Sequence, residues 1–525
     1  MRQETNRTRK AILAGTLLGL SFTTPGQAQE QLWKSFGDAS GDLYGEVVAN
    51  AGDVNGDGFD DLIVGARTDS TAGGMAGMAR VVSGLDGTTI HTLYGSSANE
   101  QFGLSVAGIG DVDGDQHADF AVGAPFYGSK RWVGRVSVYS GQTGALLYHV
   151  QRGWFDRLGY SLAPIGDMSG DGVPDFVVGS VYGLYAEVVS GVDGSNVMTL
   201  KPTGGAPLFF GYAMATGGDV NGDGVGDLLV GDPDSQDLGW VNGSVWVFSG
   251  ADGSVIRHIQ GGGGFFGGAV AMAGDVDGDG RCEVLVGAPD ESTIASKGGQ
   301  ATLYSGLDGS VLMSFAPTAA TQANWNLGTT VAGAGDLNRD GFADLLVGTP
   351  GYSDVGGGSG TVFLYSGRDG LPLYHFEDWT GTDPKLIGQG LAVAGDVNGD
   401  HLPEICAGAS IESSPTLPSV GSVSLYRAND LWVDATPRHA TANDALEVDV
   451  GQGAAGGLYA LLLLDLNGVP MTTILALGAL DATGRATFHG TVPAGLGTMT
   501  ADFKAFAFDT RHKVVDCGVE RLYLH

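Results

Sequence analysis

One short acidic stretch recurs seven times along the chain, at intervals of 52 to 61 residues. Its first copy is Asp53-Val-Asn-Gly-Asp-Gly-Phe-Asp-Asp61, and the other six begin at Asp111, Asp167, Asp219, Asp275, Asp336 and Asp396. Each copy follows an aromatic or aliphatic residue plus glycine and a short apolar run. Each also precedes a second apolar run that ends in glycine. A repeat of this length indicates a small structural unit that buries its apolar faces against neighbouring copies.

Each repeat contains four predicted strands. The run after the acidic loop, such as Phe120–Gly123, is apolar on both faces, as in a strand that is covered on both sides. The next run, such as Gly134–Tyr139, alternates between apolar and polar residues, which predicts a strand. A Ser-Gly-x-Asp-Gly turn, as at Ser83–Gly87, then leads into a last apolar run. Seven four-stranded units predict an all-β, seven-bladed β-propeller, with an open stack of β-units as the alternative.

The two ends of the repeat region complement each other. The seventh repeat has its acidic loop and the two runs that follow, but no fourth strand comes after Tyr426. The missing strand is found near the start of the chain, where Leu32–Gly37 resembles Thr92–Gly95 at the end of the first repeat. We therefore expect residues near 30–37 to supply the outer strand of the seventh blade and to close the ring.

Segments outside the repeats predict two further regions. Residues 1–28 combine basic residues, a short apolar run at Ala11–Phe22 and small residues before Gln29, a pattern typical of a cleaved secretory signal. We expect the chain to be secreted, or held at the cell surface or in a periplasm. Residues 29–428 form the predicted propeller. Residues 429–525 lack the acidic loop and predict a separate small β-sandwich-like domain.

The charge of the chain limits its partners. There are 59 Asp and Glu residues against 26 Lys and Arg, a net charge of −33. Such a surface repels phosphate backbones, which argues against nucleic-acid binding, and it attracts cations. No segment beyond the N-terminal one is apolar over the roughly 20 residues that a membrane-spanning helix needs. We expect a monomer without a membrane span.

We number each acidic loop from its first aspartate, which is position 1. Positions 1 and 5 are Asp in all seven copies, position 9 is Asp or Glu, and position 3 is Asn, Asp or Ser. Oxygen-bearing side chains at alternate positions of a tight loop can converge on one point. Ca²⁺ takes about 6–8 oxygen ligands, commonly with a backbone carbonyl near position 7. One such loop could be a solvated acidic turn, but seven with the same spacing predict up to seven structural calcium ions.

The predicted metal ligands occupy positions 1, 3, 5, 7 and 9 of each loop. In chain order they are Asp53, Asn55, Asp57, Phe59 and Asp61; Asp111, Asp113, Asp115, His117 and Asp119; Asp167, Ser169, Asp171, Val173 and Asp175; Asp219, Asn221, Asp223, Val225 and Asp227; Asp275, Asp277, Asp279, Arg281 and Glu283; Asp336, Asn338, Asp340, Phe342 and Asp344; Asp396, Asn398, Asp400, Leu402 and Glu404. Gln116 and His401 replace the usual glycine at position 6, and Ser169 is a weak ligand. We therefore expect the second, third and seventh loops to bind most weakly.

Three motifs recur in a fixed order: Phe102-Gly103, the acidic loop and Gly123-Ala-Pro125. This combination resembles the FG-GAP repeat, the unit of the seven-bladed head of integrin α subunits, over roughly residues 30–428. The resemblance implies a calcium-bearing propeller used in adhesion or protein binding, with the loop positions above as ligands. All seven repeats carry the loop here, whereas integrin heads carry it in only some blades. We expect a secreted chain with an integrin-like head.

Strand order in such a ring places the acidic loops and the Ser-Gly turns at one end, which we call the acidic face. The connections from second to third strand and from one blade to the next lie at the other end, which we call the loop face. Aromatic and basic residues of the kind found in recognition surfaces fall in these connections. They are Trp132, Trp154, Trp240, Trp325, Trp379, Lys130, Arg131, Arg152 and Arg157.

These tryptophans either pack between the blades or form a site for a protein or glycan ligand. For the second case we assign Trp132, Trp154 and Arg157 as the ligand-binding residues. The chain shows none of the common hydrolase, metalloprotease or phosphate-loop motifs, and no catalytic residue is assigned. The preferred function is therefore calcium-dependent adhesion or binding. The alternative is a secreted propeller enzyme, a lyase or hydrolase acting on polysaccharide.

Overall fold

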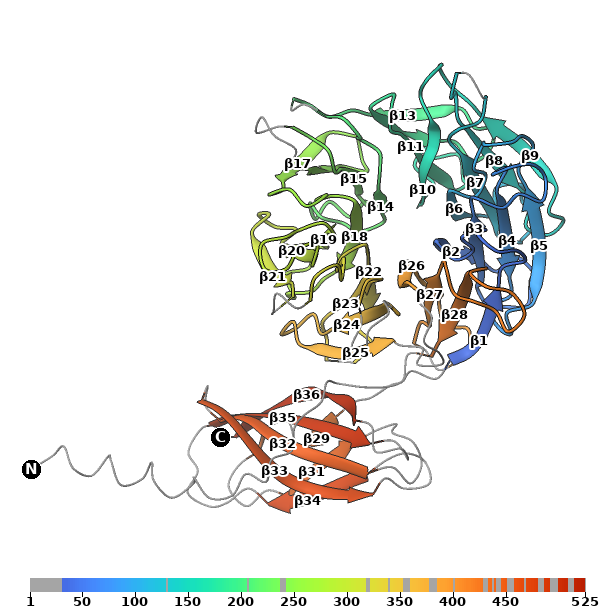
Figure 1. The fold of residues 1–525 in the computed structure, drawn as a ribbon. Helices are drawn as coiled ribbons and strands as arrows, with labels where there is room; N and C mark the ends of the chain where they lie inside the picture. The colour runs from blue at the N-terminus through green and yellow to red at the C-terminus, as the bar shows by residue number, and fades with distance from the viewer. Residues whose placement is uncertain are drawn as a thin grey trace, which may run out of the picture.

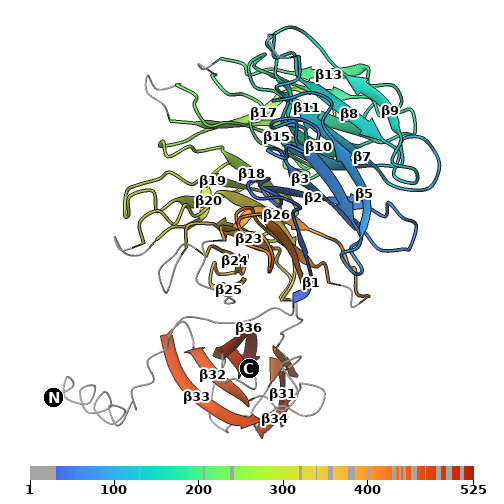
Figure 2. The same cartoon turned by 45° about the vertical axis from the view of Figure 1, so that its right-hand side comes forward.

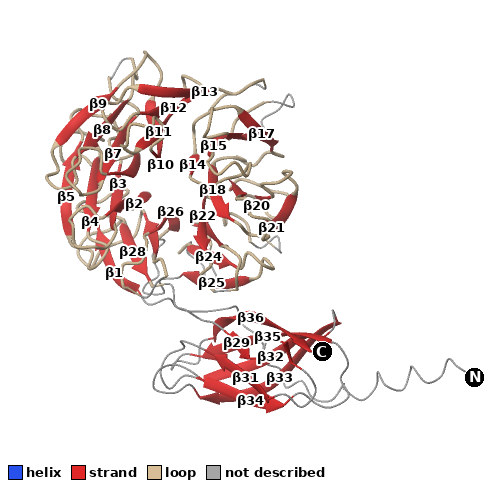
Figure 3. Cartoon of the chain, turned by 180° about the vertical axis from the view of Figure 1, so that it is seen from behind, coloured by secondary structure: helices blue, strands red, loops and turns tan. Residues whose placement is uncertain are grey.

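The computed structural model describes residues 31–427, except 129–130, 205–206, 237–241, 318–321, 339, 353–358, 377–384 and 400–401, together with the strands between 433 and 524. The predicted signal segment 1–28, the predicted ligand Asp400, and Lys130, Trp240 and Trp379 lie outside the described residues. Every element assigned in the described part of the chain is a β-strand (Figure 3). Within that part, no helix has the length and apolar character needed to cross a membrane.

Seven four-stranded antiparallel sheets form a ring with the first strand of each sheet innermost (Figure 1). The predicted seven-bladed propeller is confirmed. The first three blades are β2 (Val47–Gly52), β3 (Asp61–Ala66), β4 (Met78–Val82) and β5 (Thr89–Tyr94); β6 (Ser105–Gly110), β7 (Asp119–Ala124), β8 (Arg135–Tyr139) and β9 (Leu146–Val150); β10 (Leu158–Gly166), β11 (Asp175–Ser180), β12 (Tyr185–Val189) and β13 (Asn196–Leu200). The next three are β14 (Met214–Thr216), β15 (Leu228–Asp232), β16 (Ser244–Phe248) and β17 (Val255–Gln260); β18 (Ala269–Gly274), β19 (Glu283–Ala288), β20 (Gln300–Tyr304) and β21 (Val311–Phe315); β22 (Thr330–Gly335), β23 (Asp344–Thr349), β24 (Thr361–Tyr365) and β25 (Pro372–Phe376).

The seventh blade joins the two ends of the repeat region. It consists of β26 (Ile387–Val393), β27 (Ile405–Ala409), β28 (Ser422–Tyr426) and, as its outer strand, β1 (Gln31–Phe36). β1 pairs with β28 in antiparallel register. Trp33 of β1 is buried, and its indole N–H donates a hydrogen bond of 2.7 Å to the Gly84 carbonyl of the first blade. The N-terminal strand therefore contacts both blades at the point where the ring closes.

The apolar cores lie between neighbouring blades. All six residues of β3 are buried, as expected for a strand covered on both faces, whereas the outer strand β5 is only partly buried. One core cluster packs Ile63 and Val81 of the first blade against Phe102, Phe120 and Val122 of the second. Each blade therefore buries its faces against two neighbours, and a single blade has no complete core of its own.

Glycine allows the backbones of adjacent blades to touch at every joint. A Cβ on Gly123 of β7 would lie 2.2 Å from the carbonyl oxygen of Gly159, which opens the third blade. The same approach occurs at all seven joints, including Gly408 against Gly45 where the ring closes, and at each one a Cβ would lie 1.9–2.3 Å from the facing carbonyl oxygen. The glycines that follow the second strand's apolar run pair in this way with those of the aromatic-glycine motifs. Both motifs are therefore explained by one contact.

The C-terminal region forms two sheets (Figure 2). The first has the strand order β29 (Val433–Thr436), β31 (Ala445–Val450) and β34 (Ala486–Thr491). The second has the order β30 (His439–Ala440), β36 (Val514–Leu524), β35 (Met499–Phe508), β32 (Leu458–Leu466) and β33 (Val469–Ala479).

The glycine contact gives a direct stability prediction. Gly123→Ala places a methyl group against backbone that cannot move without separating two blades, so we expect a loss of about 3 kcal/mol or more, the upper range for overpacking. Gly262→Ala is the control, because nothing lies within 4 Å of its Cβ position. Thermal denaturation followed by circular dichroism measures both. Equal melting temperatures for the two variants would contradict the role of the contact.

Ring closure is tested by deletion of residues 31–37 from a chain that otherwise starts at Gln29. The deletion removes Trp33 and leaves the β28 edge without a partner, so we expect a markedly lower melting temperature. The Gln29 chain itself is the reference. An unchanged melting curve would show that β1 does not hold the ring together.

Candidate metal loops and ligand-binding face

The acidic loops connect the first and second strands of each blade. In five blades position 9 is the first residue of the second strand, and in the other two it immediately precedes that strand. Antiparallel order brings each acidic loop to the same end of its blade as the Ser-Gly turn between the third and fourth strands. The seven loops therefore share the acidic face.

Position 1 organises the loop through hydrogen bonds from the backbone. The Asp53 carboxylate accepts N–H bonds from Gly56 at 2.7 Å, Asp57 at 3.1 Å and Gly58 at 2.9 Å. The same pattern recurs at Asp111, Asp167 and Asp219. Gln116, which replaces the glycine at position 6, has a φ of 73°, close to the 91° of Gly58. The second loop therefore keeps the conformation of the glycine-bearing loops.

Position 9 has a second function that the sequence pattern did not reveal. The buried Asp119 carboxylate accepts N–H bonds from Val112 at 2.8 Å within its own loop and from Gly141 of the Ser-Gly turn, also at 2.8 Å. Turn glycines donate to the position 9 carboxylate in six blades, and the position 9 side chain is fully buried in all seven. A Cβ on Gly141 would lie 1.9 Å from the Ala118 carbonyl oxygen, which explains the glycine in the turn.

Burial makes ionisation of several of these carboxyl groups unfavourable. Loss of solvent raises the pKa of Asp61 and of Asp119 to about 6, of Glu283 to about 7 and of Asp344 to about 8, although the backbone N–H groups partly offset this. Neighbouring carboxylates of the same loops raise these pKa values further, as Asp113 does for Asp119. A cation in the loop would relieve both effects, because an opposite charge favours the ionised form.

The donor set fits a hard cation. In the second loop, carboxylate oxygens of Asp111, Asp113 and Asp115 lie within 4.8 Å of one another, and Asp275, Asp277 and Asp279 form an equivalent cluster in the fifth loop. Such oxygens can share one Ca²⁺, whose bonds to oxygen are about 2.3–2.6 Å long. In four other loops position 3 is Asn, which contributes an amide oxygen in place of a third carboxylate. The ligand assignments themselves stay predictions.

Neighbouring loops are joined by hydrogen bonds. The N–H at position 8 of the second loop, from Ala118, donates to the Asp53 carbonyl of the first loop at 2.9 Å, and His117 Nδ1 lies 2.9 Å from the Val54 carbonyl oxygen. Cys282 bonds in the same way to Asp219. The Arg281 guanidinium adds a bond of 2.7 Å to the Asn221 carbonyl. Each of these loops is therefore bonded directly to the backbone of its neighbour.

On the loop face, the structure brings the three predicted ligand-binding residues into one patch. The Arg157 guanidinium lies 4.7 Å from the centre of the Trp132 ring, and the Arg131 guanidinium stacks over Trp154 at 3.7 Å. The two connections are tied together, because Phe155 donates an N–H bond of 2.8 Å to the Arg131 carbonyl. Arg152, which the sequence also placed in this surface, pairs instead with Glu187.

Three further aromatic residues complete the patch. Arg157 also lies over Tyr182 at 3.9 Å and over Phe126 at 4.6 Å. The exposed fractions are 63 % for Trp154, 53 % for Phe155, 50 % for Tyr182 and 41 % for Trp132, which is high for side chains of this size. Tyr182 and Phe126 lie in the same kind of connection as Trp132, so an aromatic count along those connections could have identified them. Trp325 belongs to another part of the face, where it packs on Tyr352 at 4.6 Å.

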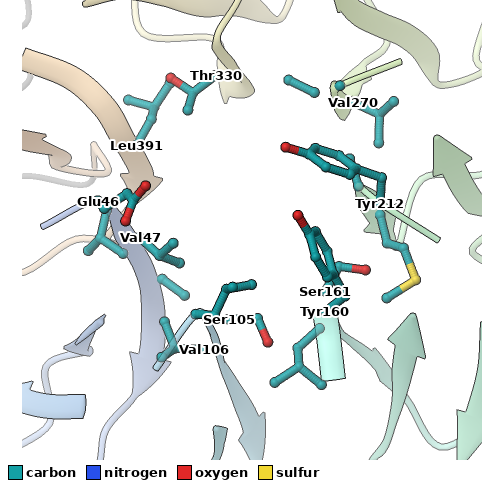
Figure 4. A pocket seen from close by; sticks show the side chains of 18 of the residues that line it. Glu46, Val47, Ser105, Val106, Tyr160, Ser161, Tyr212, Val270, Thr330 and Leu391 are labelled. Atoms are coloured by element: carbon teal, nitrogen blue, oxygen red, sulfur yellow. The ribbon is translucent and has the colours of Figure 1, made fainter. Parts of the chain in front are cut away.

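A cavity of about 470 Å³ lies inside the ring at the inner strands (Figure 4). Its polar residues include Glu46, Arg67, Tyr160 and Tyr212. Arg67 holds the Glu46 carboxylate through two bonds of 2.5 and 3.0 Å, and the two tyrosine rings lie 5.2 Å apart. Burial raises the pKa of both tyrosines. The sequence does not reveal this cavity, because its lining comes from short segments of all seven repeats, mostly three or four residues from each, that only ring closure brings together.

Comparison with known proteins finds matches to a repeat family and to integrin alpha chains. The FG-GAP repeat family matches residues 44–82, 102–139, 266–304 and 327–365, each range running from an aromatic- or aliphatic-glycine motif to the end of a third strand. Integrin alpha-V of Gallus gallus is 32 % identical over 232 residues, and integrin alpha-5 of Xenopus laevis is 31 % identical over 249 residues. These alignments cover 40 % and 44 % of this chain but only 21 % and 22 % of the relatives.

A comparison with solved structures gives a superoxide reductase (neelaredoxin) from Ignicoccus hospitalis, aligned over 18 % of this chain and 78 % of the reductase chain at 15 % identity. The TM-score is 0.15, which is too low to indicate a shared fold. The repeats, their order and the ring agree with the family match and with the integrin relatives. The chain thus carries FG-GAP repeats and folds them into an integrin-α-like seven-bladed β-propeller.

Proposed function

We propose that this chain is an exported, calcium-binding propeller that binds a protein or glycan ligand through its loop face and acts in adhesion. One observation carries the proposal: four large aromatic side chains, each at least 41 % exposed, surround two arginines on the second and third blades. Tryptophan, tyrosine and arginine are the residues that most often dominate binding energy at interfaces. A soluble protein has little other reason to leave such a patch in contact with water.

The proposed role of calcium is structural. Each ion would be held by the carboxylates at positions 1 and 5, the side-chain oxygen at position 3 and the backbone carbonyl at position 7, with the position 9 carboxylate completing the site and linking it to the Ser-Gly turn. The ion supplies positive charge where loop carboxylates repel one another. Because position 9 opens the second strand, the ion would fix the first strand to the second in each blade and hold the connections at the other end in place.

Export and oligomeric state complete the proposal. The signal-like pattern of residues 1–28 supports export, and calcium at extracellular concentrations suits loops that bind at about 10⁻⁴–10⁻³ M. We propose a monomer, because ring closure by β1 satisfies the seventh blade within one chain.

A polysaccharide lyase or hydrolase is the weaker alternative. The central cavity is the place where such chemistry would be sought. Its carboxylate, Glu46, is held by Arg67 with two bonds, and the pKa values of Tyr160 and Tyr212 lie above their ordinary range. General acid and base groups work best with a pKa near the operating pH. Ligand binding at the loop face therefore explains more of the molecule than catalysis in the ring.

The two functions assigned to the loop positions can be separated by substitution. Asp119→Ala removes the acceptor of buried N–H groups, so we expect a loss of about 2–4 kcal/mol with or without calcium. Asp115→Ala removes a half-buried ligand that accepts one backbone N–H bond, from His117 at 2.9 Å, so the melting temperature in excess chelator should fall less than in Asp119→Ala while the increase on adding calcium becomes smaller. Differential scanning calorimetry in both buffers measures this. A wild-type melting temperature that calcium and chelator leave unchanged would contradict the structural role of the ion.

The ligand site is tested with Trp132→Ala, Trp154→Ala and Arg157→Ala in one variant. We expect the wild-type chain, in calcium, to capture a partner from extracellular extract or from intact cell surfaces, and the variant to lose it while keeping the wild-type melting temperature. Trp325→Ala, elsewhere on the same face, is the control. Capture by the triple variant at the wild-type level would count against the loop-face site.

A further inference from the structure

Two arginines of the loop-face patch have no acidic partner. Among the described residues, neither the Arg131 nor the Arg157 guanidinium makes an ion pair or a side-chain hydrogen bond, and Arg157 Nε is shielded from water without a partner. Other arginines have polar partners: Arg80 pairs with Asp38 and Arg135 with Glu100, whereas Arg257 and Arg281 donate to backbone carbonyls. With 59 acidic against 26 basic residues, a carboxylate could easily have been supplied here. The unpaired charges are therefore a property of this patch.

Stacking orients these two groups. Arg131 lies flat enough on Trp154 to reach 3.7 Å from its centre, and Arg157 approaches Tyr182 to 3.9 Å. A guanidinium that gives a face to an aromatic ring keeps its N–H donors at its edge, and those donors match the two oxygens of a carboxylate. The edges of aromatic rings also carry partial positive charge. The patch thus presents donors and positive edges to a partner.

The backbone beneath the patch is held in an unfavourable conformation. Trp132, Phe155 and Arg157 have φ values of 38°, 67° and 50°, in the left-handed region that large side chains rarely adopt. Such residues cost of order 1–3 kcal/mol each and persist where the surroundings fix them. Here the N–H bond of Arg157 to the Trp132 carbonyl, at 3.1 Å, ties two of them together. The same conformation and bond recur at Met75, Asn99 and Gln101 and at Lys297, Asn324 and Asn326, so the patch side chains project from a fixed backbone element of the repeat.

We infer that Arg131 and Arg157 bind the carboxylate side chains of an acidic segment of a partner protein, with Trp132, Trp154, Phe155 and Tyr182 packing against apolar residues beside those carboxylates. This inference rests on the loop-face site proposed above and adds the chemistry of its ligand. Charge complementarity selects the partner: an isolated basic patch on a chain of net charge −33 attracts an acidic segment locally while the rest of the surface repels it. Binding is therefore confined to one place and one orientation.

A peptide fits better than a glycan for a geometric reason. Sugar rings bind to aromatic residues through open ring faces. Trp154, Trp132 and Tyr182 each give a face to a guanidinium, and Tyr182 also meets the Phe209 ring edge-on at 6.1 Å between centroids. One face of each of these rings is thus already occupied by a guanidinium, which leaves less ring face for a sugar and keeps charged donors beside the rings for carboxylates flanked by apolar side chains.

The test uses the full chain in calcium and a fluorescein-labelled peptide of alternating glutamate with leucine and phenylalanine. The same peptide with glutamine in place of glutamate is the matched probe. Fluorescence anisotropy should show binding of the acidic peptide that weakens as salt is added, and at least about tenfold weaker binding of the glutamine peptide. Arg131→Gln and Arg157→Gln should each lower affinity for the acidic peptide by about tenfold, with Arg→Lys variants between these and the wild type.

Lys201→Gln is the control variant, because it removes one positive charge from an exposed residue that follows β13 toward the same face. It should change affinity less than about twofold. Equal binding of the two peptides, or equal losses in Lys201→Gln and the arginine variants, would overturn the inference. Because the peptide comparison uses the wild-type chain, a misfolded variant leaves the test intact.

Two competition experiments separate this inference from the proposed function. If the acidic peptide displaces the partner captured by the wild-type chain, the inference is supported. If alginate, a polymer of sugar acids, displaces that partner and the peptide does not, the peptide inference fails while the loop-face site stands. If the triple variant still captures the partner, the proposed site itself fails.

Discussion

The contact between two glycines at each joint is the constraint on which the ring depends. The second-strand glycine of one blade lies against the carbonyl of the glycine that opens the next, so closely that no Cβ fits at any of the seven joints. This contact brings β-sheets near enough for the inter-blade cores to form, as between Ile63 and Phe120. Because the last joint places Gly408 against Gly45, the same spacing has to hold around the whole circle. The ring is therefore held by seven joints of nearly equal spacing rather than by any one strong interaction.

On the acidic face, burial and charge act in opposite directions. In six blades the position 9 carboxylate accepts N–H bonds from a loop and from a turn, which joins the two hairpins of the blade. Burial raises the pKa of Asp61, Asp119, Asp227, Glu283 and Asp344, which makes their charged form costly. The described carboxylates at positions 1 and 5, which are half-buried or exposed, add repulsion. A cation would neutralise this repulsion while leaving the N–H bonds in place. The backbone N–H groups of the loop already have acceptors, but the negative charge of its carboxylates is left largely unbalanced. We therefore expect calcium to stabilise a ring that is already formed.

The sequence predicted what repeats and missed what depends on contact between repeats. Blade number and the order of the motifs followed from local patterns, and the closing strand from the resemblance of residues 32–37 to residues 92–95. The glycine contacts, the bond from Gly141 to Asp119 and the pairing of Arg152 with Glu187 were not predicted, because each joins residues more than 20 positions apart. The patch is an intermediate case: composition selected Trp132, Trp154 and Arg157, but only the fold showed that Tyr182 of the next connection completes it.

Strand order places the predicted metal loops and the proposed ligand-binding patch on opposite faces of the ring. Antiparallel blades put the acidic loops at one end of the ring and the blade-to-blade connections at the other. The predicted metal ligands and the residues exposed to a partner therefore lie on opposite faces. The connections can vary in length and composition because the glycine joints and position 9 carboxylates fix the strands that carry them. Trp132, Phe155 and Arg157 show how: the same left-handed backbone recurs at Met75, Asn99 and Gln101 and at Lys297, Asn324 and Asn326, so different side chains occupy equivalent backbone positions. A binding surface can therefore change on this scaffold without altering the contacts that close the ring.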